Sequence, residues 1–169
     1  MEAVLNSTPL IYLAKINHLD LLGKVYDQIY IPTSVYEETV LRGLEKKFLD
    51  AKFIKKAVDK GTIEVRELTS EQKAEAKRLT QFANMGGGEA EAIVLAKHLN
   101  IELIIDDVIA QGVARTLGLD AHWTTSFVIR LVSKKLVSRE DARKVIEDLV
   151  SSGYRISEEV LIEILKVLS

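Results

Sequence analysis

The 169-residue sequence contains no cysteine, which excludes disulfides and thiolate metal sites. Any bound metal must therefore use oxygen ligands or the three histidines. No apolar run approaches the roughly 18 residues that a membrane span requires. The first residues also lack the basic region of a signal peptide. We therefore expect a cytoplasmic protein that has no membrane partner.

An excess of positive charge is missing as well. The formal net charge of −2 argues against a protein that coats nucleic acid through bulk charge. It does not exclude a nuclease, because carboxylates in a metal site lower the net charge while local lysines and arginines meet the substrate. The glycine and lysine patterns of nucleotide-binding loops are absent. No pair of histidines has metal-ligand spacing, so structural roles are favoured for them.

Strand-like segments alternate with amphipathic segments, and no linker, repeat or low-complexity run interrupts them. This alternation predicts one α/β domain over residues 1–169, with a parallel sheet covered on both faces. We expect one helix over residues 45–60, and C-terminal helices, within about 126–169, that pack on the same core. The predicted strands cover residues 3–5, 26–31, 62–66, 102–105 and 121–124.

The most informative residues lie where predicted strands end. Asp106 and Asp107 follow an apolar strand, and Asn6 follows another. Since the carboxyl ends of parallel strands meet at one edge of a sheet, these side chains should lie close together. Carboxylate oxygens there suit Mg²⁺ or Mn²⁺, which favours metal-dependent phosphodiester chemistry. As alternatives, Asp107 caps the next helix, and Asn6 caps the turn after its strand.

A second acidic group follows the glycines at 86–88, at the start of a predicted helix. Glu89 and Glu91 point about 200° apart, so both should not serve one metal directly. Glu91 shares a row with core-facing residues, where a carboxylate needs a partner or a cation. We assign Glu91 to the site. Glu89 either supports the ligands or is a first-turn acid favoured by the helix dipole.

Glu38 is a weaker candidate when it is taken alone. It lies less than two helical turns after Pro32, and Val35 precedes it by about one turn. A carboxylate in such a position is more often part of a solvated helix face than a ligand. Its assignment to the site therefore depends on the other motifs of the chain.

These motifs occur in an order that resembles the PIN domain, the superfamily of the VapC-like ribonucleases, and a prokaryotic PIN-like subgroup in particular. The resemblance spans nearly the whole chain, and the ordered set is specific although each motif alone is weak. The segments that carry it are Asn6–Lys15, Ile31–Glu38, Gly88–Ala96, Ile105–Asp107 and Gly153–Glu159.

The resemblance implies a three-layer α/β/α sandwich around a mostly parallel sheet. It also implies an endoribonuclease that depends on Mg²⁺ or Mn²⁺ and acts on single-stranded RNA, often as the toxin of a toxin–antitoxin pair. The implied partners are an RNA substrate, a small antitoxin protein and a second copy of the chain.

The resemblance also assigns site residues. The acidic positions of the family map onto Asn6, Glu38, Glu91 and the pair Asp106 and Asp107, and the four carboxylates among them are the expected metal ligands. Supporting roles fall to Ser7 and Glu89, and to Thr124 or Thr125, which match a hydroxyl position of the family.

Asn6 departs from the family pattern, because the broader family has Asp at this position. The departure removes one negative charge from the expected metal site. It motivates an alternative function, that of a degenerate, non-catalytic PIN module that binds RNA or a protein partner.

Overall fold

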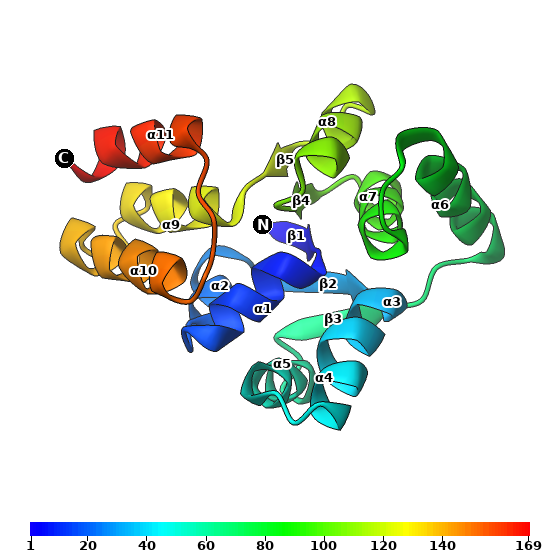
Figure 1. The fold of residues 1–169 in the computed structure, drawn as a ribbon, viewed down its shortest axis with the longest axis horizontal. Helices are drawn as coiled ribbons and strands as arrows, with labels where there is room; N and C mark the ends of the chain where they lie inside the picture. Colours follow the sequence, from blue (N-terminus) through cyan, green and yellow to red (C-terminus); the bar gives the residue numbers. More distant parts are fainter.

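The computed structural model describes residues 1–169, apart from the side chain of Glu159. Five parallel strands form one sheet in the order β3-β2-β1-β4-β5 (Figure 1). The central strand β1 pairs with β2 on one side and with β4 on the other. The predicted parallel α/β sheet is therefore confirmed. The strands are β1 (Glu2–Leu5), β2 (Gln28–Pro32), β3 (Ile63–Arg66), β4 (Glu102–Ile104) and β5 (Ala121–His122).

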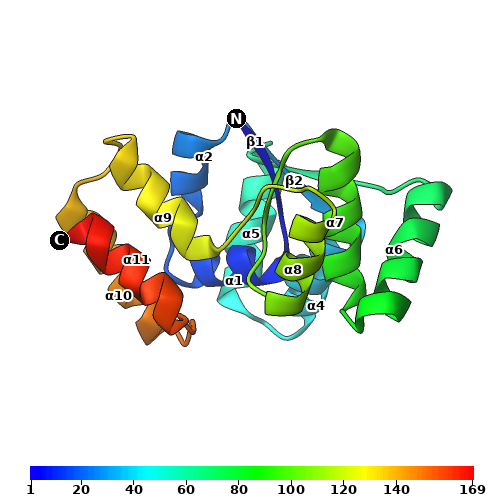
Figure 2. The ribbon, with the colours of Figure 1, turned by 90° about the horizontal axis from the view of Figure 1, so that it is seen from above.

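Helices cover both faces of the sheet (Figure 2). Successive strand residues point to opposite faces, so Ala3 and Leu5 of β1 join one apolar core and Val4 joins the other. The predicted three-layer sandwich is confirmed. The first core involves α1 (Ser7–Lys15), η1 (Leu19–Leu21), α2 (Leu22–Val25), α5 (Leu49–Asp59) and α9 (Thr124–Ser133), and the second involves α6 (Ser70–Ala83), α7 (Gly87–Leu99) and α8 (Val108–Thr116).

The C-terminal helices α10 (Arg139–Ser151) and α11 (Glu158–Leu168) pack beside α9. Val160, Ile164 and Leu168 of α11 are at most 8% exposed and belong to the first core. Leu161 and Leu165 of the same helix are 43% and 59% exposed. The apolar side chains of α11 are therefore divided between an internal face and a solvent face. Among the helices of the described chain, none combines the length and the apolar content of a membrane span.

The predicted strand over 26–31 is shifted to Gln28–Pro32, and two other predicted elements differ from the structure for a clear physical reason. The expected helix over 45–60 is interrupted, because Lys47 adopts a φ of 60° that a continuing helix does not allow. The predicted strand over 121–124 ends at His122, since the amide and hydroxyl of Thr124 bind Asp106 instead of a strand neighbour. The helical segment before the interruption consists of α3 (Thr33–Tyr36), a π-helical turn η2 (Glu37–Leu41) and α4 (Arg42–Glu45).

Candidate active site at the carboxyl edge of the sheet

A cleft of about 370 Å³ opens at the carboxyl edge of the sheet, where α1, the α3–α4 segment and α7 begin. Acidic and hydroxyl side chains dominate its lining, and among the described residues that line it Arg42 is the one basic side chain. The lining residues are Asn6, Ser7, Thr8, Ser34, Glu37, Glu38, Arg42, Gly86, Gly87, Gly88 and Glu89.

Asn6 and Glu38 face the same point above Gly88. A Cβ atom added to Gly88 would lie 3.8 Å from Oδ1 of Asn6 and 3.7 Å from Oε2 of Glu38. Asn6 is only 4% exposed, and its backbone amide donates to the carbonyl of Ile104 at 3.1 Å. The end of β1 is thereby tied to the end of β4. The absence of a side chain at Gly88 keeps the space between the two oxygens open.

Glu38 lies within the π-helical turn η2. Such turns inside α-helices are rare and often occur at functional sites, because the wider turn redirects the side chains on it. The hydroxyl of Ser7 donates to Oε2 of Glu38 at 2.6 Å. An exposed acid on a helix is thus fixed toward the start of α1, which the sequence pattern alone did not indicate.

Glu89 and Glu91 have different surroundings, as their angular separation on α7 requires. Burial and the charges of Asp107 and Glu38 raise the pKa of Glu89, so these three carboxylates interact electrostatically. Glu91 accepts a hydrogen bond of 2.5 Å from the hydroxyl of Ser34 and so ties α7 to α3. Glu89 therefore lines the cleft itself, whereas Glu91 is joined to Ser34, which also lines the cleft.

The two adjacent aspartates also differ. Asp106 accepts hydrogen bonds from the Thr124 amide at 2.8 Å, the Thr124 hydroxyl at 2.6 Å and the Tyr154 hydroxyl at 2.7 Å. Burial raises the pKa of Asp106, and these three bonds oppose the rise. Asp107 is exposed, and its Oδ1 caps α8 by accepting from the Ala110 amide at 2.8 Å. Asp106 is therefore held inward, whereas Asp107 is exposed at the start of α8 and is not among the described residues that line the cleft.

Of the two threonines matched to the hydroxyl position, Thr124 is the one that reaches an acid. The hydroxyl of Thr125 is buried and has no hydrogen-bond partner among the described residues. Tyr154 was not among the residues predicted for the site. The segment Gly153–Glu159, which belongs to the resemblance, was the one signal that pointed to it.

A different acidic trio lies near the opposite edge of the sheet. Potential ligand atoms of Glu102, Asp120 and His122 all lie within 4.8 Å of one another and could hold a metal ion. However, Arg130 already pairs with Glu102 at 2.5 Å, and Nε2 of His122 lies 2.8 Å from Oδ1 of Asp120. The Arg130–Glu102 ion pair joins α9 to the sheet and already engages one of the three potential ligands. In the sequence, Asp120 and His122 are two residues apart, which is the spacing that places side chains on one face of a strand. This spacing was the local sign of the trio.

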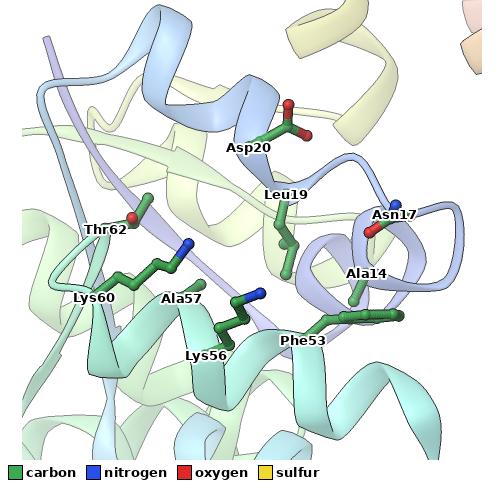
Figure 3. A pocket seen from close by; sticks show the side chains of 9 residues that line it. All are labelled: Ala14, Asn17, Leu19, Asp20, Phe53, Lys56, Ala57, Lys60 and Thr62. Carbon is green, nitrogen blue, oxygen red and sulfur yellow. The ribbon is translucent and has the colours of Figure 1, made fainter.

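A second cavity, about 330 Å³ in volume, lies away from the predicted acids (Figure 3). It is formed between α1, η1 and α5: Lys56 and Lys60 extend from the C-terminal end of α5, and Ala14 and Leu19 line it from α1 and η1. Its lining contains none of the predicted site residues. The predicted metal-dependent chemistry is therefore assigned to the acidic cleft and not to this cavity.

The donor set of the cleft suits a hard divalent cation, which prefers carboxylate and amide oxygens. In the described part of the chain, carboxylates of the cleft form no trio as tight as the one around His122. Burial raises the pKa of Glu89, and repulsion from the charges of Asp107 and Glu38 adds to this rise. A cation between Glu38, Glu89 and Asp107 would relieve that repulsion. The residues present therefore fit Mg²⁺ or Mn²⁺.

The profile of the PIN domain family matches residues 2–169, and the chain belongs to this family. Among solved structures, a PilT N-terminus domain protein from the hyperthermophilic archaeon Sulfolobus solfataricus P2 is 23% identical, with a TM-score of 0.51 over 75% of this chain and 90% of that chain. VapBC2 from Rickettsia felis, bound to a DNA fragment from their promoter, is 16% identical, with a TM-score of 0.52 over 73% of this chain and 98% of that chain. Among curated proteins, none matches significantly. The two structural likenesses concern the fold, so the roles of residues are argued from this chain.

The geometry around Gly88 generates a prediction. The methyl group of Gly88→Ala would make ordinary contacts of 3.7 to 3.9 Å, so the fold should be retained, with a melting temperature that is unchanged or higher. The methyl would occupy the point that Asn6 and Glu38 face. Mn²⁺ affinity measured by calorimetry should therefore fall three- to tenfold, which corresponds to about 1 kcal/mol. Gly87→Ala is the matched control, because its added Cβ would have no neighbour within 4 Å. Equal Mn²⁺ affinities of the two variants would contradict this placement.

Proposed function

We propose that the protein is a cytoplasmic endoribonuclease of the PIN type that cuts single-stranded RNA with the help of Mg²⁺ or Mn²⁺. The observation that carries the proposal is that Asn6, Glu38 and Glu89 line one cleft on the carboxyl edge of the sheet, with Asp107 close enough for its charge to raise the pKa of Glu89. In this proposal Glu38, Glu89 and Asp107 hold the metal and Asn6 contributes its amide oxygen. Glu89 takes the place that the sequence analysis assigned to Glu91.

When bound, the metal would activate a water molecule and stabilise charge on the scissile phosphate. The protein's own groups position the ligands: the Ser7 hydroxyl orients Glu38, and the Ala110 amide fixes one oxygen of Asp107. Arg42 at the cleft offers a guanidinium that can bind a phosphate oxygen of the RNA. No nucleophilic side chain is required, which agrees with the absence of cysteine.

The first test is cleavage of a single-stranded RNA by the purified protein with Mn²⁺, with and without chelator. Chelation should abolish cleavage. Glu89→Gln and Asp107→Asn should each lower the rate about a hundredfold, which corresponds to about 2.7 kcal/mol in the barrier. Glu91→Gln should have a smaller effect, because Glu91 acts through Ser34.

Glu71→Gln, at an exposed position in the first turn of α6, is the control and should cleave like the wild type. If the Glu89 and Asp107 variants retain wild-type rates, the activity belongs to a contaminant or to another site. If Glu91→Gln loses more activity than Glu89→Gln, the ligand set is that of the sequence analysis.

Asn6 favours the rival function, a non-catalytic module that binds RNA or a protein, because a neutral residue occupies an acidic position of the family. Asn6→Asp should separate the two functions. The added charge attracts a divalent ion, but its desolvation and its repulsion from Glu38 cancel much of the gain. We expect a net gain of about 1 to 2 kcal/mol, or roughly tenfold in Mn²⁺ affinity. The melting temperature of the metal-free variant should fall slightly.

Calorimetric titration with Mn²⁺ and thermal unfolding of the metal-free protein check this prediction. A wild-type protein that binds no Mn²⁺ up to millimolar concentrations would support the non-catalytic module. If Asn6→Asp changes neither affinity nor melting temperature, Asn6 does not act on the carboxylates of the cleft.

The proposal extends to protein partners, an antitoxin and a second copy of the chain. The likeness to VapBC2, whose structure contains promoter DNA, supports a partner protein encoded beside this one. A homodimer would place two acidic clefts along one groove. We expect sedimentation at tens of micromolar to show a dimer, and a monomer alone would contradict the homodimer.

The antitoxin has a separate test. Co-expression with the product of an adjacent small gene should yield a complex that cleaves RNA more slowly than the isolated protein.

A further inference from the structure

Tyr154 lies in the link between α10 and α11, remote in sequence from the acidic motifs. Its side chain is 6% exposed, and its hydroxyl donates to Oδ1 of Asp106 at 2.7 Å. Thr124 supplies the other two donors, to Oδ1 from its amide and to Oδ2 from its hydroxyl. Both oxygens of Asp106 are therefore engaged inside the protein. A carboxylate removed from water is tolerated because such donors replace its hydration.

This arrangement separates the tasks of the two adjacent aspartates. Asp106 is directed toward α9 and the α10–α11 link, whereas Asp107 is exposed and caps α8 through Oδ1. Because the residues are consecutive, the anchoring of one side chain fixes the backbone from which the other extends. The anchoring of Asp106 thus sets the position of Asp107.

Tyr154 also contacts the helix that begins at the site. Its ring meets that of Tyr12 edge to face, with centroids 5.2 Å apart and planes at 79°. The Tyr12 hydroxyl donates to the carbonyl of Gly153 at 3.3 Å. Tyr12 belongs to α1, whose first residue is Ser7, the donor to Glu38. One segment therefore bridges the strand ends that carry Asn6 and Asp107.

We propose that Tyr154 is a positioning residue of the active site, acting through Asp106, and that the C-terminal link is thereby part of the catalytic apparatus. The proposal rests on the proposed function, since it assigns Asp107 to the metal. Removal of the Tyr154 hydroxyl should loosen the turn at Asp106 and Asp107, and it should lower metal affinity without unfolding the protein.

Tyr154→Phe tests the proposal, because it retains the ring contact with Tyr12 and removes only the donor. In the metal-free protein, the amides of Ala110 and Thr124, which bind Asp107 and Asp106, should exchange hydrogen about tenfold faster. Mn²⁺ affinity should fall three- to tenfold, and kcat should fall more than KM rises. Thr124→Val removes a second donor to the same carboxylate and should act in the same direction.

Tyr30→Phe is the matched control, because it removes a tyrosine–carboxylate bond of 2.9 Å to Glu2, on the other core. It should leave Mn²⁺ affinity and the exchange of both amides unchanged. In an Asp106→Asn background, Tyr154→Phe should have no further effect, since both residues act along one path.

Unchanged exchange at Ala110 and Thr124 in Tyr154→Phe overturns the inference, as does a loss of Mn²⁺ affinity no larger than that of Tyr30→Phe. A wild-type protein that binds no Mn²⁺ contradicts the proposed function instead. The exchange comparison then still decides whether Tyr154 positions the aspartates.

Discussion

Several like charges are gathered at one edge of the sheet, and four of the carboxylates there accept a hydrogen bond from a nearby donor. Without donors, repulsion and lost hydration would drive these side chains outward into water. The donors belong to elements that begin at this edge or pass along it. Each hydrogen bond therefore fixes a carboxylate, and all but that of Tyr154 also hold the start of a helix in place. The pairs are Ser7 with Glu38, Ser34 with Glu91, the Ala110 amide with Asp107, and Thr124 and Tyr154 with Asp106.

Among the positions of the cleft that are acidic in the wider family, the most buried one carries a neutral residue, Asn6. Asn6 is almost fully buried at the end of the central strand, whereas Glu38 and Asp107 are exposed. A carboxylate at residue 6 would lose more hydration than one at either exposed position, and it would lie beside existing negative charge. The amide retains an oxygen at this point and avoids both costs. The arrangement therefore favours a stable metal-free fold over a tightly held ion.

The sequence was sufficient for the architecture and for the edge of the sheet where the acids lie, because both follow from local periodicity and from the topology of parallel strands. Asn6, Asp106 and Asp107 could be placed at strand ends in this way. The relation of Glu89 to Glu38 could not, because it depends on how α7 is rotated on the sheet, which packing decides. The break at Lys47 and the π-helical turn carried no clear local signal. Tyr154 reaches an acid 48 residues earlier in the chain, and a single sequence does not reveal such a contact.

The separation between Asp106 and Tyr154 has a consequence for biosynthesis. A ribosome delivers the chain from its N-terminus, so the strands and the acidic motifs emerge well before the link between α10 and α11. The nascent chain can form its sheet while one donor to Asp106 is still inside the ribosome. Completion of the site is thereby delayed until translation of the chain is nearly finished, and until then Asp106 has the two donors of Thr124 but not the hydroxyl of Tyr154.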